Sequence, residues 1–124
     1  MKISSPLQSI PLRYVKEIIL DIMINIYILK TMYEWDEHKN ELNQKKHGIS
    51  FENARYIFDG LILQGIDTRF DYQETRFRGI GLVEDLVIVV IYTTRKNLIR
   101  IISARLANQK ERGAYYEAVR RATK

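Results

Sequence analysis

Three arginines fall at strand-like positions of the sequence, where a regular backbone would hold their side chains rigidly. They are Arg76, Arg100 and Arg105. The planar guanidinium group binds two oxygens of a phosphate or carboxylate at once, and it stabilises negative charge that develops during a reaction. The other interpretation is that these arginines form surface ion pairs, which contribute little to stability. The carboxylates available for such pairs are those of Glu74, Glu84 and Glu111.

His47 is the better of two histidines as a general acid or base, because the ordinary pKa of histidine lies near neutrality. The sequence places it at the end of a helix, where a histidine also stabilises the helix dipole without any chemistry. Lys46 beside it is a candidate phosphate contact, or its stem covers Trp35. His38 is expected to be solvated. The chain has no cysteine, so a thiolate site is excluded, and no metal or other cofactor is expected.

Two helices should precede the strands. The first begins near Trp35 and carries Trp35 and Leu42 on its buried stripe, with His47 and Gly48 at its end, because glycine adopts the left-handed conformation that closes a helix. Ser50 is expected to cap a second, short helix that ends at Asp59 and Gly60. The buried residues expected in this helix are Phe51, Ala54, Ile57 and Phe58.

Four strands follow, at 61–66, 75–82, 86–93 and 98–104. Short connections predict that the last three form an antiparallel meander. Residues 86–91 are apolar on both faces, which indicates a central, covered strand. Strict alternation along the last strand would place Arg100 and Arg105 on opposite faces of the sheet. The predicted fold class is therefore α+β, with two N-terminal helices, a four-stranded antiparallel sheet and a C-terminal helix.

The C-terminal helix is expected to span 107–121 and to leave Arg112 and Tyr116 off its apolar stripe as substrate contacts. Of Tyr115 and Tyr116, one is expected to pack against the sheet, and the other is available to stack on a base. Charge is unevenly distributed: residues 33–94 have a net charge of −4, whereas residues 95–124 have a net charge of +7. The basic end suits a polyanion or an acidic protein segment, although a solvated helix has the same composition.

Residues 1–31 differ from the rest of the chain. Their apolar run, Ile18 to Leu29, is interrupted by Asp21 and Asn25 and is too short to span a bilayer. No signal-peptide cleavage site follows it, so we expect a cytoplasmic protein without a membrane partner. Two interpretations remain, an additional helix or translated sequence upstream of a natural start at Met32. Residues 32–124 are then the working domain.

Three segments in this order resemble the BrnT toxin family. They read YEWDEHKN at 33–40, KKHGISFE at 45–52 and RIISAR at 100–105, with Glu111, Arg112, Tyr115 and Tyr116 beyond them. The resemblance covers about residues 32–120 and depends on the combination of segments. It implies a RelE-like ribonuclease fold that cleaves RNA, and neutralisation by a BrnA-like antitoxin of the ribbon-helix-helix class. Operator DNA would then be bound only through the antitoxin.

Under that resemblance the substrate is RNA and the chain is a metal-independent endoribonuclease of a type II toxin–antitoxin system. Such cleavage requires a base, an acid and several cations around the phosphate. The expected catalytic residues are His47, Arg76 and Arg105. The expected substrate contacts are Lys46, Arg100, Arg112 and Tyr116. The competing hypothesis is a non-enzymatic basic module that binds nucleic acid or a partner protein.

Overall fold

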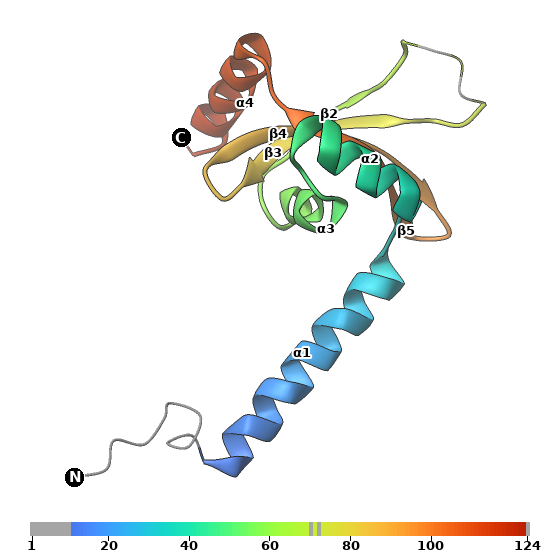
Figure 1. Ribbon diagram of the computed structural model, residues 1–124. Coiled ribbons are helices and arrows are strands. Elements are labelled where there is room, and N and C mark those ends of the chain that lie inside the picture. The colour runs from blue at the N-terminus through green and yellow to red at the C-terminus, as the bar shows by residue number, and fades with distance from the viewer. Residues whose placement is uncertain (1–10, 70, 72, 124) are drawn as a thin grey trace. The chain divides into compact units, whose positions relative to one another are not determined.

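The structure is a computed structural model that describes residues 11–69, 71 and 73–123. It divides into two units, Met1–Met32 and Tyr33–Lys124 (Figure 1). The first unit contains a long helix, α1 (Leu12–Met32); residues 1–10 of the expected N-terminal extension lie outside the described residues. Large apolar side chains along α1 are about half exposed, among them Ile18, Ile22 and Met23. No helix in the described residues is long and apolar enough to cross a membrane. That Met32 is the natural start stays a prediction.

The second unit is built on a five-stranded sheet. Its strands are β1 (Tyr33–Glu34), β2 (Leu63–Ile66), β3 (Phe77–Val83), β4 (Leu86–Arg95) and β5 (Leu98–Leu106), in the order β1-β5-β4-β3-β2. The predicted α+β class and the meander of β3, β4 and β5 are confirmed, and β4 is central as expected. The prediction of a sheet of four antiparallel strands is wrong, because β1 adds a fifth strand that is parallel to β5. Two residues are too few to produce an alternating pattern.

The described residues contain four α-helices instead of the expected three, because α1 precedes the others. α2 (Glu37–His47) is capped by Asp36 and ends at Gly48, which has a φ of 73°. The Ser50 hydroxyl caps α3 (Phe51–Ala54), which continues as the 3-10 helix η1 (Arg55–Asp59). The Ser50 cap and the ends at Gly48 and Asp59 were predicted, whereas the Asp36 cap was not. α4 (Gln109–Ala122) begins two residues later than expected, because Asn108 and Glu111 form a reciprocal capping box at its start.

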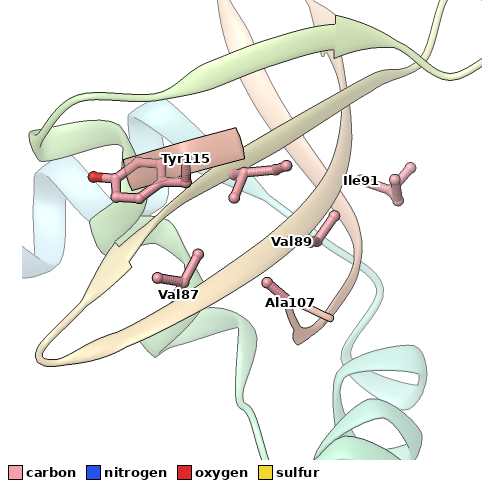
Figure 2. Close-up of a cluster of buried hydrophobic side chains, with 6 residues drawn as sticks. Val87, Val89, Ile91, Ala107 and Tyr115 are labelled. Atoms are coloured by element: carbon pink, nitrogen blue, oxygen red, sulfur yellow. The ribbon is translucent and has the colours of Figure 1, made fainter. Parts of the chain in front are cut away.

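One face of the sheet packs against α4. Tyr115 is 2% exposed and belongs to a buried cluster with Val87, Val89 and Ile91 of the central strand (Figure 2). The same cluster includes Ala107, just before α4. Burial of an aromatic ring and several branched side chains supplies the main stabilisation of this layer. Tyr115 is therefore the tyrosine that packs against the sheet.

The opposite face packs against α3 and η1. Ile57 of η1 lies so close to β3 that a Cβ added at Gly81 would stand 2.8 Å from the Ile57 Cβ, which explains why glycine occupies this strand position. Phe51 is fully buried, as predicted. Trp35 and Phe58 are only partly buried; they pack edge-on against Phe51 and Tyr92, respectively.

α2 is attached to this core by asparagines and not by leucine. The expected buried residue Leu42 is 51% exposed, whereas Asn40 and Asn43 are 2% and 8% exposed. The Asn43 amide donates to the Ala104 carbonyl at 2.9 Å, and its oxygen accepts from the Ala104 N–H at 3.1 Å. The same amide also donates to the carbonyl of Ile49 at 2.9 Å. Asn43 thus supplies hydrogen-bond partners to the backbone of Ala104, at a position of β5 that β1 does not reach.

We expect Asn43→Ala to reduce the free energy of unfolding by about 3 kcal/mol, because it removes three hydrogen bonds and leaves buried backbone groups without partners. Urea unfolding followed by circular dichroism measures the change. Gln44→Ala on the exposed side of the same helix is the control and should change stability by less than about 0.5 kcal/mol. Equal stability of the two variants would show that the Asn43 contacts contribute nothing specific.

Candidate functional site

Four arginines share the face of the sheet that carries α4. Residues directly opposite each other on neighbouring strands project to the same side. Arg78 of β3 lies opposite Ile91 of the central strand β4. On the other side of β4, Ser103 lies opposite Ile91, Arg105 opposite Val89 and Arg100 opposite Thr93. Phe77 pairs with Tyr92. The residue before it, Arg76, therefore lies opposite Thr93. Successive rows lie about 7 Å apart along the strands. The arginines are therefore grouped around three successive positions of one face of β4, Val89, Ile91 and Thr93.

A β-bulge brings Arg100 and Arg105 to the same face. Ile91 pairs with Ser103, whereas its neighbour Tyr92 pairs with Ile101, so Ile102 is an extra residue in β5. The bulge changes the alternation by one residue. The expectation that the two arginines lie on opposite faces is therefore wrong. No local pattern in the sequence marks the position of this bulge.

Arg105 is held by Glu111 in a two-pronged ion pair. Its Nη1 and Nη2 donate to the two carboxylate oxygens at 2.7 Å and 2.9 Å, and Nη1 also donates to the Leu106 carbonyl at 3.3 Å. The hydrogen bonds from Arg105 lower the pKa of Glu111, and those to Glu111 raise the pKa of Arg105. Within the described residues Nε has no acceptor, so one edge of the guanidinium stays available for a phosphate.

Arg78 is a functional candidate that was not predicted from the sequence. It lies two residues from Arg76 on the same face and is exposed. Among the described residues none forms a hydrogen bond or an ion pair with it, although its charge contributes to the lowered pKa of Glu111. The spacing of two residues within the predicted strand was the signal that could have found it.

His47 and Lys46 meet β5 beside this arginine face. A hollow of about 240 Å³ is formed by the end of α2 and the bulge of β5; its wall includes Lys46, His47, Ile102 and Ser103. Ser103 and Arg105 are two residues apart on β5, which corresponds to about 7 Å. His47 is therefore placed next to the arginine face, at the exit of α2 that was predicted for it.

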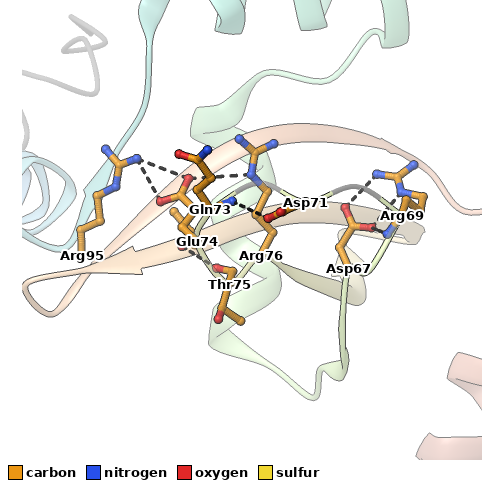
Figure 3. Close-up of polar contacts among 9 residues, drawn as sticks. Asp67, Arg69, Asp71, Gln73, Glu74, Thr75, Arg76 and Arg95 are labelled. Carbon is orange, nitrogen blue, oxygen red and sulfur yellow. Dashed lines mark hydrogen bonds and ion pairs between the residues drawn. The ribbon is translucent and has the colours of Figure 1, made fainter.

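Arg76 lies one residue before β3, not within a strand as expected. Its Nε is 3.8 Å from the Glu74 carboxylate, which also accepts a hydrogen bond from Arg95 at 3.1 Å (Figure 3). The Thr93 hydroxyl donates to the Thr75 carbonyl at 2.7 Å. These contacts fix the segment that carries Arg76 against the end of β4.

The remaining predicted contacts are more dispersed. Arg100 lies 3.6 Å from the Glu34 carboxylate at the start of β5. Arg112 is exposed and donates to the Ala107 carbonyl at 2.7 Å. Tyr116 is 51% exposed, with its ring edge-on to Tyr115, so it is the tyrosine that can stack on a base. Arg76 and Arg105 do pair with carboxylates that the ion-pair interpretation named, Glu74 and Glu111.

Comparison with known protein families gives a match over residues 35–111, to the ribonuclease toxin BrnT of type II toxin–antitoxin systems. The chain belongs to the BrnT family. The matched segment begins just before α2, ends at Glu111 of the capping box and includes strands β2, β3, β4 and β5. A search of curated proteins finds no match. The resemblance noted from the sequence is thus confirmed at the level of the family, a family of ribonuclease toxins.

The BrnT match includes both the arginine face and the end of α2, whereas α1 lies outside it. In the described residues no group of three or more histidine, cysteine or carboxylate side chains is placed to hold a metal ion. The charges that the fold brings together here are arginine and lysine cations, with the carboxylates of Glu34, Glu74 and Glu111 at the margin. Such a surface is suited to binding and polarising a phosphodiester.

The Arg105–Glu111 pair predicts a pH-dependent contribution to stability. Glu111 has a lowered pKa in the folded chain, so its contribution is present above the ordinary pKa of glutamate and is lost as the pH falls through the lowered value. We expect Glu111→Gln, which retains the helix cap, to cost about 1 kcal/mol at pH 7. Unfolding measured from pH 7 down to pH 2 should show the two proteins converging. A constant difference at all pH values would contradict this assignment.

Proposed function

We propose that this BrnT chain is a metal-independent endoribonuclease whose active site is the arginine face between α2 and α4. The observation that carries the proposal is the grouping of Arg76, Arg78, Arg100 and Arg105 on one face of a rigid sheet, with His47 at its margin. Preorganised cations of this kind stabilise charge on a phosphate oxygen more effectively than mobile ones. RNA is the expected substrate, and the cytoplasm is the expected place of action.

In the proposed reaction the 2′-hydroxyl of RNA attacks the adjacent phosphorus. A bond from the 2′-oxygen to phosphorus forms and the bond to the 5′-oxygen breaks, giving a cyclic phosphate and a free 5′-hydroxyl. One group accepts the 2′ proton, and another donates a proton to the leaving 5′-oxygen. His47 is proposed for one of these transfers. Arg105 faces the phosphate with its free edge, while Glu111 holds the opposite edge as a positioning residue.

Lys46, Arg112 and Tyr116 are proposed as contacts to RNA outside the reacting phosphate. Lys46 and Arg112 are exposed cations, and Tyr116 offers an exposed ring. A BrnA-like ribbon-helix-helix antitoxin is the proposed partner. Acidic or amphipathic segments of it would cover β5 and α4 and so block access to Arg105. Electrostatic attraction between such surfaces accelerates association and makes it sensitive to salt.

A binding module without catalytic activity is the second candidate. It is favoured by the ion pairs of Arg76, Arg100 and Arg105 with carboxylates, because structural pairs of this kind need no substrate. Incubation of the purified full chain with RNA in EDTA distinguishes the two functions. The proposal expects fragments that carry a cyclic phosphate and a 5′-hydroxyl. Binding without cleavage, with or without added divalent ions, would support the module.

We expect Arg105→Ala to lower the cleavage rate by about 100-fold or more, because it removes a cation from the transition state. Arg76→Ala should have a similar or smaller effect. Single-turnover cleavage in EDTA measures both rates. Arg121→Ala is the matched control, since this arginine is exposed on α4 and pairs only with Glu117 among the described residues. Rates equal to that of the control would remove these arginines from the site.

His47→Gln tests proton transfer, because glutamine forms hydrogen bonds but does not titrate near neutrality. We expect unchanged RNA binding and a cleavage rate lower by about 100-fold or more. His38→Gln on the exposed start of α2 is the control. A variant with the wild-type rate would leave His47 with a role at the helix end alone.

A further inference from the structure

A second hollow lies on the arginine face, beyond Arg105. It has a volume of about 450 Å³ and is bounded by β2, β3 and the first turns of α4. Arg78 and Lys110 are both exposed and contribute to its wall. Glu111, which holds Arg105, also lines it. The hollow therefore adjoins the proposed position of the reacting phosphate.

The lining of this hollow combines an apolar surface with a cationic one. Leu63, Ile80 and Ala114 contribute the apolar part, and Ile80 is only 5% exposed. Gln64 of the edge strand β2 also lines the hollow, so amide groups that donate and accept hydrogen bonds lie at its wall. An unpaired base presents the complementary surfaces, a flat face that packs on apolar side chains and an edge that pairs with an amide.

We infer that this hollow is a subsite for one nucleotide of the RNA substrate, with the base against Leu63, Ile80 and Ala114 and a phosphate at Arg78 and Lys110. The inference rests on the proposed function for its class of substrate. A nucleotide is favoured over a side chain of a partner protein because the hollow adjoins the position proposed for the reacting phosphate. Arg78 and Lys110 form no ion pair with a carboxylate among the described residues, so both cations can bind a phosphate. The subsite gives the enzyme a preference for the base next to the cleavage position.

Gly65 provides a way to fill the subsite without disturbing the fold. It pairs with Arg78 across β2 and β3, so a side chain there would share the face of Arg78. A Cβ added at Gly65 meets nothing within 4 Å, and its φ lies outside the left-handed region. Valine is favoured in strands. Gly60→Val is the matched control, because a Cβ there also meets nothing within 4 Å, its backbone is extended and it does not line the hollow.

The experiment measures binding of the four nucleoside 3′-monophosphates and of ribose 5-phosphate to the full chain by NMR titration. One nucleotide should bind about tenfold or more tightly than ribose 5-phosphate, because its base buries apolar surface against Leu63, Ile80 and Ala114. Gly65→Val should lose this preference, Gly60→Val should keep it, and Arg78→Ala should weaken all five ligands.

Equal binding of the nucleotides and ribose 5-phosphate would overturn the subsite, as would a preference that survives in Gly65→Val. Failure to bind any of the five ligands would also overturn it. The measurement requires no cleavage. A preference for one base in a chain that fails to cut RNA would therefore refute the nuclease while supporting the nucleotide subsite.

Discussion

The pairing of Asn43 with the backbone of Ala104 is the contact on which the arrangement of the site depends. β5 would otherwise be an edge strand along most of its length, because β1 pairs only with Ile99 and Arg100. A single side-chain amide supplies the donor and the acceptor that a neighbouring strand would supply. It also fixes α2 against β5 at Ala104, two residues after the bulge at Ile102. The distance of His47 from the arginine face is therefore set by a buried polar contact, which tolerates less sliding than apolar packing.

Glu111 has an equivalent role at the other end of β5. One of its oxygens accepts from the backbone N–H of Asn108 at 2.9 Å, while both bind Arg105. The start of α4 and the direction of the Arg105 guanidinium are thus determined by the same carboxylate. Tyr115 also anchors α4 in the core. Arg105 is therefore held as rigidly as the packed layer of α4 and the sheet. Rigid placement of a cation is the condition under which it contributes most to catalysis.

Features determined by neighbouring residues could be predicted from the sequence. The Ser50 cap, the end of α2 at Gly48 and the central position of β4 are of this kind. Features that depend on residues far apart were not predicted: β1 becomes a strand only by pairing with β5, and Asn43 meets Ala104 across 61 positions. The bulge at Ile102 belongs to the same class. It also reversed the expected relation between Arg100 and Arg105, which shows how one extra residue in a strand can assemble a site.

Several arginines on one face repel one another, and the free protein has to offset this repulsion. Glu34, Glu74 and Glu111 do so, each at the margin of the face and each within 4 Å of an arginine nitrogen. Arg105 shows how such a pair can be compatible with substrate binding, since an end-on carboxylate leaves the Nε edge open. Arg78 has no such partner among the described residues, so an RNA phosphate would meet it without displacing a carboxylate. The carboxylates therefore orient the paired arginines, and Arg78 is the position at which an incoming phosphate gains the most binding free energy.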